Sequence, residues 1–215
     1  MLRMARQRVV IAVVMLLGLG SVALLAMRGR SQMTAGFWFE VAPASVGELS
    51  ERLGGPITPA DLATIASVAR GEVRSAFANT RLQFVDSGAP RFRVRVVPTL
   101  TTFSKIPIAG GSRSIGGMRG HGAVNFITVA SNAIAYAPPG TPRDELIRAI
   151  GRGIGRTAVH EFAHQVLSDF PVDNTTDRLS YEFADLRAEH FYAELHWGIA
   201  ASRLQERIGL AAFPR

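Results

Sequence analysis

The stretch TAVHEFAHQVL, residues 157–167, holds two histidines four residues apart and a glutamate directly after the first. On an α-helix, side chains at i and i+4 lie on one face, so both imidazoles point the same way. The other side chains of this stretch are mostly apolar or small, and a buried helix does not keep His160, Glu161 and His164 together unless something satisfies them. The spacing therefore predicts two metal ligands, His160 and His164, with Glu161 as the catalytic base.

The helix that carries this motif is predicted to begin near Thr141 and to end at about Leu167, before Pro171. Inside a helix each glycine costs about 1 kcal/mol relative to alanine. Three glycines stand within this one: Gly151, Gly153 and Gly155. They indicate either close packing against a neighbouring element or a break near Gly151.

A last helix is predicted from about Thr176 to Ile208. Side chains suited to metal binding recur along one of its faces: Glu182, Asp185, Glu189 and His196. Such a stripe forms either a solvated face or a buried set of metal ligands and the carboxylates that orient them. A catalytic zinc needs a third protein ligand and one open position, and we expect this stripe to supply the ligand.

The HExxH motif resembles that of the zincin metallopeptidases, and specifically their glutamate-ligand branch, the gluzincins. The resemblance covers residues 160–164 closely and the 180s loosely. It implies a third ligand on a following helix, and Glu182, 18 residues after His164, matches that role best. Asp185 and Glu189, 21 and 25 residues after His164, are the alternatives.

The resemblance further implies zinc-dependent hydrolysis of peptide bonds, with Zn²⁺ held by His160, His164 and Glu182 and with Glu161 as general base. The substrate would be a peptide or a protein. A second group usually stabilises the oxyanion. Four side chains are candidates for that role: Tyr181, Arg187, Tyr192 and His196. We favour His196 because it extends the stripe, although a core histidine beside Trp197 is an equal alternative.

The remaining pattern predicts an α+β fold. Residues 36–41 (GFWFEV) and the alternating residues 91–98 (RFRVRVVP) are expected to be strands. A helix should begin at Thr58 and Pro59 and run to about Asn79. We expect a small mixed or antiparallel sheet with the HExxH helix, followed by a helical C-terminal part, with a cleft between them.

Two segments between these elements bear on the site. Residues 109–122 are rich in glycine and predict a mobile loop near the cleft. Residues 123–130 (AVNFITVA) predict a strand. Zincin folds carry a strand over the active-site helix that binds extended substrate, and residues 123–130 are the candidate for it.

Residues 9–27 form an uncharged apolar run of 19 residues. As a helix this run spans about 28 Å, close to the thickness of a bilayer core. Three arginines precede it and two follow, which favours a cytoplasmic N-terminus and an extracytoplasmic domain. We therefore expect residues 1–30 to be a single-pass membrane anchor and residues 31–215 to be the peptidase domain. The alternative is a signal peptide cleaved near residues 21–23.

Charge and cysteine content narrow the remaining possibilities. The formal charge is +7, of which five arginines in the first 30 residues supply +5, leaving +2 for the other 185. No basic run with interleaved aromatics follows, so a nucleic-acid partner is not expected. The chain has no cysteine, so a transition metal must be held by His, Asp or Glu. The sequence does not reveal the oligomeric state.

Two other functions compete with the peptidase. One is a catalytically silent, membrane-anchored binding domain on a zincin-like fold, against which the intact Glu161 argues. The other is a scaffold in which HExxH is a coincidental polar patch. Metal content distinguishes the scaffold with a coincidental motif from the other two functions. Substitution of Glu161 distinguishes the silent binding domain from the peptidase.

Overall fold

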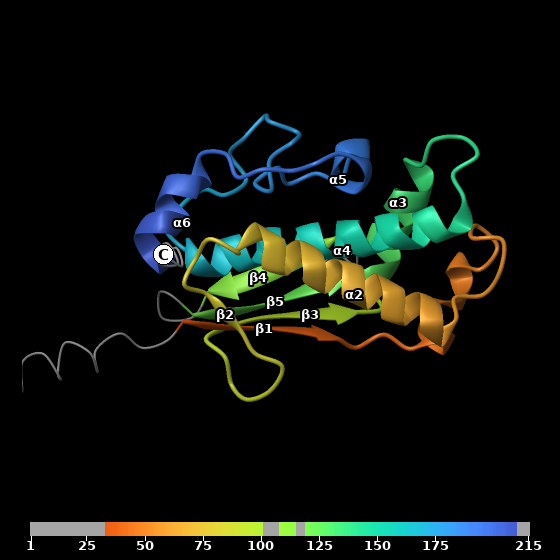
Figure 1. Ribbon diagram of the computed structural model, residues 1–215, viewed down its shortest axis with the longest axis horizontal. Coiled ribbons are helices and arrows are strands. Elements are labelled where there is room, and N and C mark those ends of the chain that lie inside the picture. The colour runs from red at the N-terminus through yellow and green to blue at the C-terminus, as the bar shows by residue number, and fades with distance from the viewer. Residues whose placement is uncertain (1–32, 101–107, 115–118, 210–215) are drawn as a thin grey trace, which may run out of the picture. The chain divides into compact units, whose positions relative to one another are not determined.

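A computed structural model describes residues 33–100, 108–114 and 119–209 (Figure 1). These residues form an α+β fold around one five-stranded mixed sheet with the strand order β2-β1-β3-β5-β4. The strands are β1 (Thr34–Phe39), β2 (Gln83–Phe84), β3 (Phe92–Val97), β4 (Gly110–Ser114) and β5 (Gly120–Asn125). The helices are η1 (Pro43–Leu49), α2 (Pro59–Ala76), α3 (Phe126–Ala135), α4 (Arg143–Val166), α5 (Ala188–Tyr192) and α6 (Ala200–Ile208).

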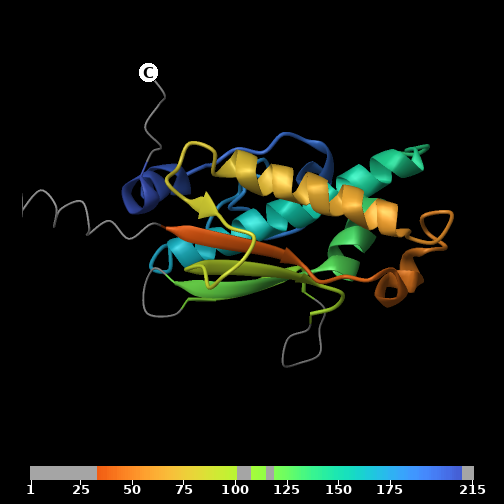
Figure 2. The same ribbon diagram turned by 60° about the horizontal axis from the view of Figure 1, so that its bottom comes forward.

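The sheet is parallel except at one edge. Strands β2, β1, β3 and β5 run parallel, and β4 pairs antiparallel with β5. On β3 the apolar residues Phe92, Val94 and Val96 are fully buried while Arg93 and Arg95 are exposed, which confirms the alternation predicted for this strand. The buried face lies under α2 and α4, which cover the same side of the sheet (Figures 1 and 2).

Helix α2 begins as predicted. Thr58 is its N-cap: the Thr58 hydroxyl accepts the Asp61 amide at 3.1 Å, and the Asp61 carboxylate accepts the Thr58 amide at 2.8 Å. This reciprocal capping box, together with Pro59, explains why the helix starts here. It ends at Ala76, three residues before the predicted Asn79.

Helix α4 is unbroken across its glycines, and close packing is the reason for them. A β-carbon on Gly151 would lie 2.7 Å from the Val68 β-carbon, and one on Gly155 would lie 2.7 Å from the Ala69 carbonyl oxygen. Both contacts are with α2, whose backbone therefore lies against α4. Gly153 faces Phe191 in the same way, at 2.4 Å.

The prediction for residues 109–122 was wrong where they are described. Residues 110–114 and 120–122 belong to the antiparallel pair β4 and β5. The strand predicted at residues 123–130 ends at Asn125, whose side-chain oxygen accepts the Thr128 amide at 3.1 Å and caps α3. A short apolar run does not distinguish a strand from a helix. Here the helix begins after Asn125 because asparagine is a favoured N-cap residue.

The single helix predicted for residues 176–208 was also wrong. Only α5 and α6 are helical there, with turns and irregular chain before and between them. The backbones of Ser180 and His196 pair as an isolated parallel bridge, and the Trp197 indole donates to the Ala76 carbonyl at 2.8 Å. These tertiary contacts override the helix propensity of the segment. Glu182, Asp185, Glu189 and His196 therefore do not share one helical face.

No helix in the described ranges is long and apolar enough to cross a membrane. The predicted anchor, residues 1–30, lies outside the described residues.

Candidate metal centre

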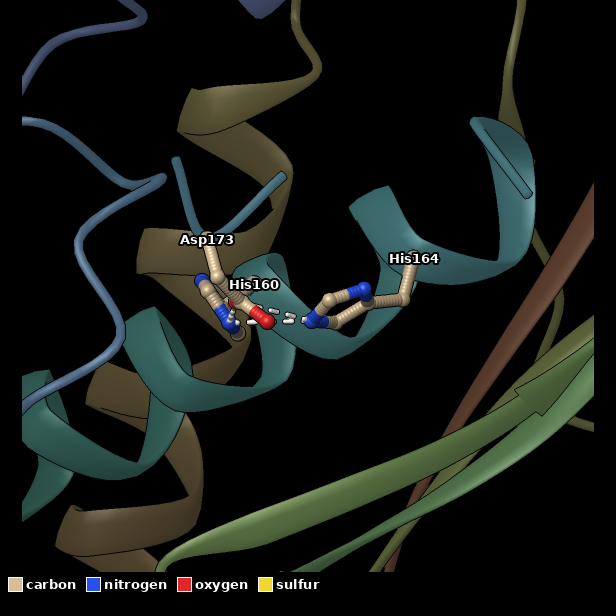
Figure 3. A group of neighbouring side chains, drawn as sticks. All are labelled: His160, His164 and Asp173. Carbon is tan, nitrogen blue, oxygen red and sulfur yellow. Dashed lines mark hydrogen bonds and ion pairs between the residues drawn. The ribbon is translucent and has the colours of Figure 1, made fainter. Parts of the chain in front are cut away.

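His160 and His164 lie one turn apart on α4, as their spacing predicts (Figure 3). Their ring centroids are 4.7 Å apart, and their Nε2 atoms face each other at 3.1 Å. His160 is largely buried and His164 is partly open to solvent. The motif thus presents two imidazole nitrogens to one point at the C-terminal end of α4.

Asp173 completes this pair, although no motif in the sequence marks it as a ligand. Its Oδ1 atom lies 2.9 Å from His160 Nε2 and 3.2 Å from His164 Nε2, and Figure 3 shows the three groups converging. Asp173 stands in the turn that follows α4, where the Asn174 amide donates to the Pro171 carbonyl at 3.2 Å and Val172 is buried. Within the described ranges this trio is the one group of three His, Asp or Glu residues arranged to share a metal ion.

The predicted third ligand, Glu182, lies elsewhere. Its carboxylate is fully buried and accepts the backbone amides of Gly198 at 2.7 Å and Ala200 at 3.0 Å. It therefore ties the chain before α6 to the segment around Tyr181. The sequence alone does not show which acidic residue after the motif lies near the histidines. The path of the folded chain places Asp173, and not Glu182, in the cluster.

His160 is oriented by a backbone carbonyl. Its Nδ1 atom lies 2.9 Å from the Tyr181 carbonyl oxygen, which only accepts, so Nδ1 carries a proton and Nε2 is the nitrogen that faces the cluster. Such an outer contact is the usual partner of a metal-bound histidine. Burial alone would lower the pKa of His160, but the Asp173 carboxylate and the Tyr181 carbonyl outweigh it and raise that pKa.

The pKa values of Asp173 and His164 are both lowered, as a positive charge close to them would favour. A hydrogen bond to His160 holds the pKa of Asp173 below its ordinary value, so this carboxylate is ionised. Burial and the charge of His160 lower the pKa of His164, so its imidazole stays neutral. A neutral histidine and an ionised carboxylate are the forms in which these side chains bind metals.

Glu161 is buried beside the cluster, with 4% of its surface exposed. Its Oε2 atom is shielded from solvent and has no hydrogen-bond partner in the described part of the chain. Burial raises the pKa of this carboxyl to about 7, against an ordinary value of 4.5. A carboxyl with that pKa exchanges a proton readily near neutral pH, as a general base and acid must.

A cavity of about 570 Å³ opens over these residues. Its walls come from the start of β4, one face of α3, the C-terminal half of α4 and the chain before α5. The polar and charged side chains that line it are Ser112, Thr128, Asn132, Tyr136, Thr157, His160, Glu161, His164, Asp173, Asp185, Arg187 and His190. The cluster therefore lies on the wall of a site large enough for part of a peptide.

Strand β4 crosses α4 at Glu161. A β-carbon on Gly110 would lie 2.4 Å from Glu161 Oε1, and the Ser112 hydroxyl donates to the Glu161 carbonyl at 2.9 Å. The Gln165 amide holds the strand from below, donating to Ser112 Oγ at 3.0 Å and bonding both backbone groups of Arg93. Both β4 and β5 pack against the HExxH helix, but residues 123–125 belong to the interior strand β5, and β4 is the strand at the sheet edge that contacts Glu161.

The candidate oxyanion groups are placed apart from the cluster with one exception. His196 is exposed and its Nε2 lies 3.0 Å from Asp177 Oδ2. The Tyr192 hydroxyl donates to the Ala133 carbonyl at 2.8 Å, and the Tyr181 ring contacts Trp197. Of the four side chains, only Arg187 lines the cavity, where it pairs with Asp185 at 3.1 Å.

Compared with known protein-family models, the chain matches none, and no curated protein sequence is significantly similar to it.

Proposed function

We propose that this protein is a zinc-dependent peptidase of the zincin type, with the metal held by His160, His164 and Asp173. The observation that carries the proposal is the convergence of three donor atoms within 2.9–3.2 Å of one another beside the buried carboxylate of Glu161, whose Oε2 atom has no partner in the described residues. Asp173 takes the place that the sequence analysis gave to Glu182.

The donor set fits a catalytic zinc. Ligands that each lie about 2.0–2.2 Å from a tetrahedral zinc lie about 3.3 Å from one another, close to the distances seen here. Two imidazoles, one carboxylate and no thiolate form a common set for catalytic zinc, which keeps a fourth position open. Asp173 is 56% exposed, so the cluster opens to the cavity and a substrate can reach it.

The residues of this chain supply the proton transfers. A bound zinc would contribute Lewis acidity, which makes a water molecule more acidic and polarises a carbonyl group. Glu161 accepts a proton from the attacking water and returns it to the amine that leaves. The Tyr181 carbonyl keeps His160 in the tautomer that presents Nε2.

Strand β4 supports a peptide as the substrate. It is one of the two edge strands of the sheet in the described residues, and its start lines the cavity. An edge strand has backbone N–H and C=O groups that can pair with an extended peptide. Because Gly110 lies against Glu161, a peptide paired there would have its backbone near the base.

The apolar segment supports an anchored protein. If residues 1–30 cross the membrane with the N-terminus in the cytoplasm, the peptidase domain faces the extracytoplasmic space. The first described strand begins at Thr34, so the domain would begin a few residues after the anchor.

Zinc content of the full-length protein tests the site. The wild-type chain should bind about one zinc, and Asp173→Asn should weaken binding by more than the roughly 10- to 100-fold that a lost outer contact costs. Glu182→Gln keeps an acceptor oxygen for Gly198 and Ala200, so it should retain the metal. Asp177→Asn is an exposed control.

Two results would contradict the assignment. If Glu182→Gln loses zinc and Asp173→Asn keeps it, the third ligand is the one that the sequence analysis favoured. If neither the wild type nor any variant binds zinc after the metal is supplied, HExxH is a polar patch and the peptidase proposal fails.

A further inference from the structure

The cavity continues from Glu161 along one polar face of α3. Thr128, Asn132 and Tyr136 stand at i, i+4 and i+8, and all three line the cavity. Apart from Ser131, the rest of α3 is apolar, with its buried residues packed in the core. Thr128 and Asn132 on this short helix, and Tyr136 at its C-cap, thus line the cavity although the helix is otherwise a core element.

The opposite wall of this end is polar as well. Thr157 precedes Glu161 by one helical turn, and its hydroxyl lies 3.2 Å from His190 Nε2. His190 Nε2 also lies 3.2 Å from the Gly153 carbonyl. Both side chains are buried, and burial lowers the pKa of His190 to about 3, so its imidazole is neutral at physiological pH.

This end of the cavity lies beside the reacting groups. A β-carbon on Gly110 would lie 2.9 Å from Thr157 Cγ2 and 2.4 Å from Glu161 Oε1, so one residue of β4 contacts both. A substrate side chain that enters between α3 and Thr157 therefore belongs to a residue next to the peptide bond that is cleaved with Glu161 as the base.

The lining of this end has hydrogen-bonding capacity to spare, and apart from the metal cluster and Glu161 the charged side chains that line the cavity form an ion pair. Asn132 Nδ2 donates to the Thr128 carbonyl at 2.8 Å, which leaves Asn132 Oδ1 as an acceptor with no partner in the described ranges. The charged side chains near the rim, Asp185 and Arg187, neutralise each other at 3.1 Å. An aliphatic side chain would desolvate polar groups without pairing them, and a charged one would find no opposite charge.

We propose that this end of the cavity binds an uncharged substrate side chain with a hydroxyl or carboxamide group, next to the bond that is cleaved. Serine, threonine, asparagine and glutamine are the residues of this class. Asn132, Thr128 and Thr157 determine the preference, and Asn132 supplies the central acceptor. The inference rests on the proposed peptidase function and specifies its substrate.

Cleavage of a proteome-derived peptide mixture by the zinc-loaded full-length protein tests this preference. Mass spectrometry of the products should show the four residues enriched at one position flanking the cleaved bond. Asn132→Leu has nearly the same shape and should shift that position toward aliphatic residues by about tenfold or more. Ser131→Ala, on the same helix but outside the cavity lining, should leave the profile unchanged.

A binding measurement separates the two proposals. Immobilised zinc-loaded Glu161→Gln protein is exposed to the same peptides, and retained peptides should be enriched in the same four residues. Zinc-bound wild type that cleaves nothing would overturn the peptidase function, while the retained peptides would still decide the preference. Cleaved or retained peptides with aliphatic or charged residues at that position, or no shift in Asn132→Leu, would overturn the preference.

Discussion

At the residue scale, Glu161 and His190 show how burial sets the chemistry of a side chain. Burial raises the pKa of Glu161 to about 7 and lowers that of His190 to about 3, because it disfavours the charged form of each. The first shift prepares a carboxyl for proton transfer. The second keeps an imidazole neutral within the polar wall of the cavity.

Replacing Glu161 should separate metal binding from catalysis. Glu161→Gln has the same shape but cannot accept a proton, so it should retain zinc and lower kcat for peptide cleavage by about 100- to 10,000-fold. Glu194→Gln, at an exposed position, is the control and should leave kcat unchanged. Full activity in Glu161→Gln would show that another group is the base.

The neutrality of His190 predicts a pH-dependent stability. Its pKa is lower in the folded chain than the unfolded value of 6.5, so the unfolded state binds the proton first as the pH falls. Folded stability is therefore lost progressively from about pH 6.5 toward pH 3, by up to about 1.4 kcal/mol per pH unit. In urea unfolding, His190→Gln should lack this contribution, so its stability relative to wild type should improve as the pH falls. A pH-independent difference would show that folding does not lower the pKa of His190.

At the element scale, the contact between α2 and α4 places the HExxH helix. Gly151 and Gly155 let the two backbones approach, and the Gln165 amide fixes β4 and β3 against the other side of α4. These contacts fix the positions of the helix that carries Glu161 and of strand β4, which lies against it. The glycines therefore serve packing, although each is unfavourable in a helix.

Alanine substitutions should show this packing. Gly155→Ala would place a methyl group 2.7 Å from the Ala69 carbonyl, and we expect a net loss of about 1–3 kcal/mol in the free energy of unfolding. Gly71→Ala in α2 meets nothing within 4 Å and should gain up to about 1 kcal/mol from helix propensity. Chemical denaturation measures both, and a stabilising Gly155→Ala would mean that the helices separate without cost.

At the scale of the whole molecule, the proposed anchor and the proposed peptidase domain should be separable. The described residues have one core, built from the sheet, α2 and α4, and it begins within a few residues of Thr34. The chemistry proposed for the cavity uses only residues of this domain. Membrane attachment and zinc binding should therefore respond to different changes.

Removal of residues 1–30 should release the protein from membranes and preserve zinc binding. The full-length chain should sediment with membranes and resist extraction by salt, and a C-terminal tag should be accessible from the extracytoplasmic side. The intact mass of the mature protein separates an anchor, which keeps residue 1, from a signal peptide cleaved near residues 21–23. A full-length chain that stays in the salt-soluble fraction would contradict the anchor.

Local patterns in the sequence determined the elements whose causes are local. Thr58 and Pro59 start α2, the alternation of Phe92, Val94 and Val96 makes β3, and the i, i+4 spacing of His160 and His164 puts both rings on one face. These features arise within one helical turn or along one strand. The α+β fold class and the two histidines of the site could therefore be predicted from the sequence.

Only the tertiary structure decided the third member of the cluster and the strand over the helix. Asp173 reaches the histidines because a turn reverses the chain after α4, and β4 lies over Glu161 because Gln165 and Ser112 fasten it there. The supposed helix of residues 176–208 gave way to backbone pairing and buried contacts between distant residues. Contacts of this kind depend on the path of the whole chain, and no local pattern encodes that path.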